Sequence, residues 1–178
     1  VLGLTEDNSI YIGADPSATT DTASQNTALG ILTLDAITTG DGNTAVGYSA
    51  GTKLDTGYYN VFMGVHAAST GTSVNRSVVV GYLAGNKLED IRQSTIVGYQ
   101  AFTAGTTGDY NTIIGSDTAR SGTTMTQNTI VGNSAALNLV ESSFNTAVGN
   151  NALLGHATQA TDSAYNVAIG HSAMYVAS

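Results

Sequence analysis

A five-residue motif that recurs every 17 residues constrains this chain more than any other feature of its sequence. The motif is Asn or Ser, a β-branched residue, an uncharged residue, an aliphatic residue and glycine, as in residues 43–47 (NTAVG). Equal spacing of this kind indicates a solenoid, because each coil must stack on the previous one in register. The motif glycines are Gly13, Gly30, Gly47, Gly64, Gly81, Gly98, Gly115, Gly132, Gly149 and Gly170.

The repeats fill nearly all of the 178 residues, so we expect a single domain. It consists of an entry segment at residues 1–8 and repeats over residues 9–178, with a four-residue insertion in the coil at 149–169. The sequence has no apolar stripe with the 3.6-residue period of a helix, because the glycines interrupt it. A 17-residue coil has a contour of roughly 56 Å, which allows two short strands and two turns. The sequence therefore predicts an all-β parallel β-solenoid, or β-roll, of ten coils.

The composition excludes several classes of function. Only 10% of the residues are charged and the net charge is −8, so the basic surface of a nucleic-acid-binding protein is absent. The chain has no Cys, which excludes disulfides and thiolate metal sites. No apolar run approaches the ~20 residues of a membrane span. His66, His156 and His171 are scattered, and we expect no metal, no cofactor and no membrane insertion.

The two columns before the motif glycine predict assembly. The residue directly before the glycine is aliphatic in every repeat, and the residue two before it is uncharged and mostly apolar. Neighbouring strand residues point to opposite faces. One face fills the coil, and the other would leave an apolar patch too large for a soluble monomer. We infer that further copies of the chain cover it in closed cyclic symmetry, and composition alone does not choose between two and three copies.

Two other columns have a structural interpretation. Glycine after a strand permits a positive φ or a close approach of chains at a corner. Asn amides stacked on successive coils can form a hydrogen-bonded ladder. Ser occupies the Asn position in the remaining repeats. The Asn column contains Asn26, Asn43, Asn60, Asn111, Asn128, Asn145 and Asn166.

Three features of the sequence are shared with catalytic or ice-binding proteins. Residues 47–51 (GYSAG) match the nucleophile elbow G-x-S-x-G, with His66 one repeat after Ser49, but no helix and no orienting carboxylate follow. Glu89 and Asp90 are adjacent carboxylates beside Lys87 and Arg92, which favours a solvated loop over a glycosidase pair. Columns of Thr suggest ice binding, but Asp and Glu interrupt one of them. We therefore expect no catalytic residues.

The variable segments between the motifs hold most of the charge and several aromatic residues. Loops on a rigid scaffold commonly carry recognition, and Tyr with polar neighbours suits sugars or protein surfaces. The alternative, that these segments are merely solvated, stays open. The candidate ligand-binding residues are Tyr58, Tyr59, Glu89, Asp90, Arg92, Tyr110, His171 and Tyr175.

The repeats resemble YadA-like head domains, which occur in trimeric autotransporter adhesins and in phage tail fibres. The resemblance rests on residues 47–51 (GYSAG), 81–85 (GYLAG) and 98–101 (GYQA) and on the NTAVG copies, and it covers residues 9–178. It implies a left-handed parallel β-roll, three chains around a common axis and a role in attachment. Adhesin head repeats are usually shorter than 17 residues, and nothing here looks like their coiled-coil stalk or membrane anchor.

The opening at residues 8–13 looks more like a phage fibre segment. The ending at residues 175–178 fits what remains after a self-cleaving chaperone domain is removed. We therefore expect a non-enzymatic, homotrimeric tail-fibre segment, located outside the cell on the virion, that attaches to a host-surface glycan or protein. The alternatives are the head of a bacterial trimeric adhesin at the bacterial cell surface and a structural spacer without a ligand.

Overall fold

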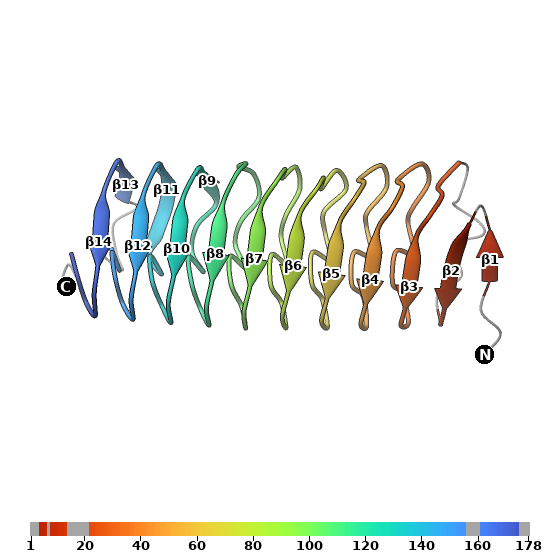
Figure 1. The fold of residues 1–178 in the computed structure, drawn as a ribbon, viewed down its shortest axis with the longest axis horizontal. Helices are drawn as coiled ribbons and strands as arrows, with labels where there is room; N and C mark the ends of the chain where they lie inside the picture. Colours follow the sequence, from red (N-terminus) through yellow and green to blue (C-terminus); the bar gives the residue numbers. More distant parts are fainter. Residues whose placement is uncertain (1–3, 7, 14–21, 156–160, 175–178) are drawn as a thin grey trace.

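A computed structural model describes residues 4–6, 8–13, 22–155 and 161–174. These residues form a rod in which coils stack one after another along the long axis (Figure 1). The rod is an all-β parallel β-solenoid, and its described residues contain no helix. It completes about eight turns, close to the ten coils that the repeats predict.

The main sheet runs the length of the rod, with its strands lying across the rod axis (Figure 1). Strand β1 pairs antiparallel with β2, and every later pair is parallel. The register follows the repeat, since Thr27 pairs with Thr44 and Thr44 with Val61. The strands of this sheet are Leu4–Glu6 (β1), Ser9–Ile12 (β2), Thr27–Leu29 (β3), Thr44–Val46 (β4), Val61–Met63 (β5), Val78–Val80 (β6), Thr95–Val97 (β7), Thr112–Ile114 (β8), Thr129–Val131 (β10), Thr146–Val148 (β12) and Val167–Ile169 (β14).

The second strand expected in each coil is regular only toward the C-terminal part of the described chain. There β9 (Thr124–Thr126), β11 (Leu139–Ser143) and β13 (Thr161–Ala164) form a three-stranded parallel sheet. Three earlier coils have glycine at the position that corresponds to Met125, at Gly40, Gly57 and Gly108, and glycine weakens a strand, while Val74 and Ile91 occupy this position in the coils between them. Between these regions the pairing is reduced to isolated bridges, such as Asp90 with Thr107.

The core fills the inside of the coils. The residue two before each motif glycine points inward, and Phe62, Ile96 and Ile113 are fully buried in this column. The Ala three positions after the glycine is also buried, which agrees with the tight inner corner that a small residue indicates. Both columns keep the same role along the rod, so the core is continuous from coil to coil.

Bulky core residues occupy two positions, four and seven residues after the motif glycine. Leu54 and Leu88 fill the later position where the earlier one is glycine, whereas Phe102 fills the earlier position and Gly105 the later one. A Cβ atom on Gly105 would meet the Phe102 ring. Several coils therefore hold one large side chain in one of two arrangements, whereas the coil after Gly30 holds both Leu34 and Ile37 and the coil after Gly64 holds only Ala68 and Gly71 at these positions.

The Asn column forms a buried ladder along the rod. The backbone N–H and the side-chain amide of Asn43 both donate to Asn26 Oδ1, at 2.9 and 3.0 Å. Asn60 donates to Asn43 Oδ1 in the same way, at 3.1 and 2.9 Å. Ser77 and Ser94 continue the ladder, because Ser94 donates its backbone N–H to Ser77 Oγ at 3.2 Å. These hydrogen bonds are the ladder that the column of amides predicts from the sequence.

The motif glycines lie at a corner where successive coils approach closely. Gly64 has a φ of +131°, and a Cβ atom there would lie 2.6 Å from the carbonyl oxygen of Gly81. Both readings of the glycine column, a positive φ and a close approach, therefore apply at this corner. A side chain at this position would push neighbouring coils apart.

Left-handed backbone is also found at three further positions of each coil, where most residues are not glycine. These positions lie two and four residues after the motif glycine and five residues before it. Ser49, Ala68 and Tyr59 represent them, with φ of 56°, 49° and 57°. Non-glycine residues are uncommon in this region. The stacked coil enforces it because the neighbouring coils fix each backbone position by hydrogen bonds.

One long face of the rod exposes the apolar residues that the strands do not bury. The residue before the motif glycine points outward, so Ile114 is 36% exposed while its neighbour Ile113 is 0% exposed. The residue following the glycine extends this face and includes Tyr82 and Tyr99, which stack with ring centroids 5.6 Å apart. We call this surface the outer apolar face. It contains Ile10, Ile12, Leu29, Ile31, Tyr48, Met63, Val65, Val78, Tyr82, Tyr99, Ile114, Val148, Val167 and Ile169.

Candidate functional site

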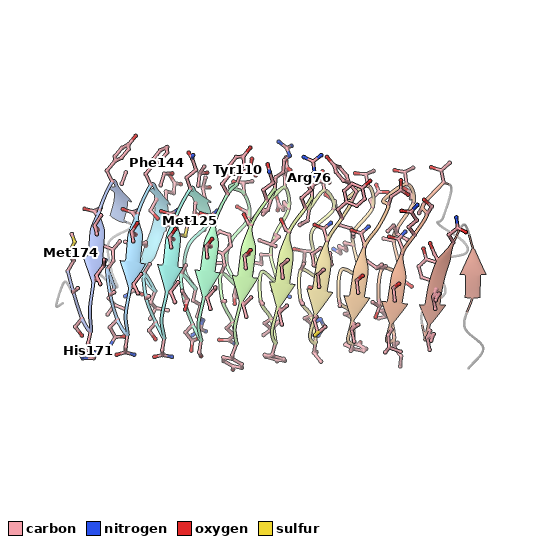
Figure 2. All side chains as sticks on the ribbon, in the orientation of Figure 1. Arg76, Tyr110, Met125, Phe144, His171 and Met174 are labelled. Atoms are coloured by element: carbon pink, nitrogen blue, oxygen red, sulfur yellow. The ribbon has the colours of Figure 1, made fainter. Side chains whose placement is uncertain are left out.

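A row of exposed side chains with planar head groups follows one long edge of the rod. Each residue of the row stands five positions before a motif glycine, just before a strand of the main sheet begins. Figure 2 shows three of them, Arg76, Tyr110 and Phe144, pointing away from the rod along this edge. We call this set the planar row: Tyr59, Arg76, Gln93, Tyr110, Gln127, Phe144 and Tyr165.

The backbone holds the planar row firmly. Every member has left-handed backbone, with φ between 51° and 61°. Its N–H donates to a carbonyl of the preceding coil: Arg76 to Tyr58 at 2.9 Å, and Tyr110 to Arg92 at 3.0 Å. Because the same rung repeats in each coil, the side chains are spaced by the coil separation, about 4.8 Å. The side-chain head groups of the planar row are therefore evenly spaced along the rod.

Ring contacts organise two parts of the row. Phe144 and Tyr165 stack almost in parallel, with centroids 4.8 Å apart and an interplanar angle of 3°. At the other end, Tyr58 and Tyr59 meet edge to face at 5.4 Å, and Arg76 Cζ lies 5.3 Å from the Tyr58 ring centroid. Both groups combine apolar ring surface with hydroxyl or guanidinium donors.

Charged groups surround the middle of the row. Arg92 Nη2 contacts Asp90 Oδ2 at 3.1 Å, and both side chains are about half exposed. The backbone N–H of Arg92 donates to Asp109 Oδ1 at 2.9 Å, which ties two successive coils together. The carboxylate of Asp109 therefore supports the edge, while the heads of Arg92 and Asp90 face solvent.

The structure brings some of the sequence-predicted residues together and separates others. Tyr59 and Tyr110 belong to the planar row, and Tyr58 and Arg92 are the residues directly before row positions. Asp90 joins them through its contact with Arg92, and Glu89 precedes it as an exposed residue.

Two predicted residues are not part of this edge. His171 directly follows Gly170 and is exposed at the opposite corner of the coil (Figure 2). Tyr175 lies outside the described residues.

Sequence reasoning did not select Arg76, Phe144 and Tyr165. Their variable segments have little else in common, and each residue was considered apart from its column. The signal that identifies them is positional, since all stand five residues before a motif glycine. Reading that column downward from Tyr59 gives only residues with flat head groups.

The G-x-S-x-G match lacks the geometry of a nucleophile elbow. Ser49 is 5% exposed, and turns rather than a helix follow it. The His66 ring packs against Tyr48, edge to face at 5.4 Å, and no hydrogen bond joins His66 to Ser49 in the described chain. A hydroxyl activated by histidine is therefore not assembled here.

The described residues offer neither a metal centre nor a membrane-spanning helix. They include no group of three or more His, Asp or Glu side chains placed to hold a metal ion. They also include no helix long and apolar enough to cross a membrane.

Comparisons with protein-family models, curated proteins and solved structures give no match to this chain. The evidence for the solenoid fold and its 17-residue repeat therefore comes from the sequence and the structure.

Proposed function

We propose that this chain is an attachment segment of a trimeric phage tail fibre, outside the cell on the virion, and that its planar row contacts a glycan or protein of the host surface. The observation that carries the proposal is the planar row itself. Its side chains lie outside the core, yet every coil from Tyr59 onward places a flat head group there. Rings and guanidinium groups of this kind favour contact with sugars and protein surfaces.

The outer apolar face supports the trimeric part of the proposal. It exposes large apolar side chains from Ile10 to Ile169, along most of the rod. Exposed apolar patches of this extent mark interaction surfaces. The regular repetition of the face suits a copy of the same rod running alongside, because both partners then share one axial spacing.

The resemblance to YadA-like head repeats supports the number of copies and the setting. The GYSAG, GYLAG and NTAVG segments carry that resemblance. In the families that show these repeats, three chains surround one axis and the assembly serves attachment. The planar row and the outer apolar face consist of different residues, with Tyr165 of the row two positions before Val167 of the face, so assembly and ligand contact use different side chains.

The test compares binding by the assembled chain and by a variant with Tyr59→Ala, Tyr110→Ala and Tyr165→Ala. Alanine already occupies left-handed positions at Ala68 and Ala119, so the backbone tolerates the change. The labelled chains are applied to glycan arrays and to cells of candidate bacterial hosts. We expect the wild-type chain to bind and the variant to bind at least about tenfold more weakly, since aromatic residues dominate binding energy at interfaces.

A matched control replaces three exposed threonines of the neighbouring column, Thr39, Thr56 and Thr124, with alanine. This control should bind like the wild-type chain. If the tyrosine variant binds as tightly as the wild-type chain, the planar row is not part of the contact surface. A wild-type chain that binds neither glycans nor cells would instead indicate a structural spacer.

A further inference from the structure

A groove crosses four successive coils on another corner of the rod, away from the planar row. Its volume is about 460 Å³, and its lining residues stand five or six positions after a motif glycine. The planar row stands five positions before the glycine, so the two surfaces belong to different parts of each coil. The proposed attachment through the planar row therefore leaves this groove unused.

The groove concentrates positive charge in an acidic molecule. The chain has 5 Lys and Arg residues against 13 Asp and Glu residues. Lys87 and Arg120 both line the groove, and no carboxylate does. Arg120 contacts Asp117 at 3.4 Å and stays half exposed, so most donors of its guanidinium face solvent. Lys87 has no ion-pair partner among the described residues.

The distance between the two cations is set by the coil. Lys87 follows Gly81, and Arg120 follows Gly115, two repeats later. With coils about 4.8 Å apart, the two residues are separated by roughly 10 Å along the rod. A ligand that engages both must carry two acidic groups at a similar separation, as every second sugar of an acidic oligosaccharide does.

The walls between the cations suit sugar hydroxyls. Ser121 and Asn138 line the groove with side-chain groups that make no hydrogen bond to other described residues. Thr103 donates its hydroxyl to the carbonyl of Gln100 at 2.7 Å, which leaves its oxygen free to accept a further hydrogen bond. Leu137 adds a half-buried apolar surface for a ring face.

We propose that this groove is a binding site for an acidic oligosaccharide. Carboxylate or phosphate groups of the ligand pair with Lys87 and Arg120, and its hydroxyls bond to Ser121, Asn138 and Thr103. The site adds a ligand class to the attachment role and is independent of the planar row.

The experiment titrates the assembled chain with three probes and measures the dissociation constants by calorimetry. Oligogalacturonate supplies carboxylates, its methyl ester supplies the same backbone without charge, and a phosphorylated oligomannoside supplies phosphates. We expect an acidic probe to bind, the methyl ester not to bind, and added salt to weaken binding. Lys87→Gln combined with Arg120→Gln should weaken binding at least about tenfold, because charged hydrogen bonds are lost.

The matched control is Lys53→Gln. Lys53 stands in the same column as Lys87, six residues after its motif glycine, but it does not line the groove. It should bind the probe like the wild-type chain, and all variants should keep the wild-type melting temperature because the changed residues are exposed.

Three results would overturn the proposal: no binding of either acidic probe, equal binding of the methyl ester, or equal weakening by Lys53→Gln. The tyrosine variant of the planar row should still bind the acidic probe. That result separates a failure of the groove from a failure of the proposed attachment function.

Discussion

At the scale of single residues, the coil depends on backbone positions that ordinary side chains rarely adopt. The motif glycine combines a positive φ with a contact to the next coil, as at Gly64. Gly170 shares the column and has a φ of +118°, but nothing lies within 4 Å of the position that its Cβ atom would take. Substitutions at these two glycines therefore distinguish the free-energy cost of the positive φ from the cost of the contact with the next coil.

We predict that Gly64→Ala destabilises the chain by about 3 kcal/mol or more, because strained φ and a forced backbone contact add together. Gly170→Ala should cost about 1 kcal/mol, from the dihedral angle alone. Urea unfolding at one fixed protein concentration measures both values. Equal losses for the two variants would show that coil spacing does not depend on the contact between Gly64 and Gly81.

At the scale of the coil, the two arrangements of the bulky core residue are interchangeable in principle. Coils with Gly51 and Leu54, or Gly85 and Leu88, have the large residue late, whereas the coil with Phe102 has it early. Gly51, Gly85 and Phe102 all have positive φ, so glycine at position 102 would keep the backbone conformation.

We predict strong coupling between Phe102→Gly and Gly105→Leu. The first change alone opens a cavity and should cost about 4 kcal/mol. The second alone forces a side chain into the Phe102 ring and should cost about 2 kcal/mol. The double variant should recover most of the loss, since it reproduces the arrangement of Gly85 and Leu88. Unfolding free energies of the four proteins in a double-mutant cycle decide the matter, and additive losses would contradict the prediction.

Much of the coil can be predicted from the sequence because its main features repeat at fixed spacing. The pairing of Thr27 with Thr44 follows directly from the 17-residue interval. The partial second sheet was harder to predict, because residue size at one position does not decide its strands. Met125 lies in β9, whereas Val74 and Ile91 at the corresponding position of earlier coils lie outside any strand.

The planar row was not predicted from the sequence, for a different reason. Arg76 and Phe144 differ in chemistry, and only the position that they share in the repeat places them on the same edge of the rod. His171 was a candidate because it belongs to the end of the sequence at residues 171–178, and the coil places it at the opposite corner. Sequence alone gives a residue's position in the repeat, and the fold of the coil decides which corner that position reaches.

At the scale of the whole molecule, one strand position separates folding from assembly. Ile113 is fully buried within its own coil, whereas Ile114 belongs to the outer apolar face. A charge at the first position disturbs the core of one chain, whereas a charge at the second disturbs only the contact with the partner chain that we propose to cover this face.

We predict that Ile113→Asp abolishes the cooperative fold, because burying a lone carboxylate is expensive. Ile114→Asp should keep the β-type circular dichroism spectrum but lower the molar mass measured by light scattering. The wild-type chain should have about three times its 18.1 kDa mass. A monomeric wild-type chain, or an unchanged mass for Ile114→Asp, would contradict the proposed trimer.

The orientation of the strands also determines how the rod carries mechanical load. Strands lie across the rod, so the hydrogen bonds between coils point along its axis (Figure 1). Tension applied at the two ends therefore loads these bonds one row at a time, and coils detach in sequence. Each detached coil replaces about 4.8 Å of rod with up to about 56 Å of extended chain. Such a rod lengthens stepwise under force and dissipates mechanical energy each time a coil detaches.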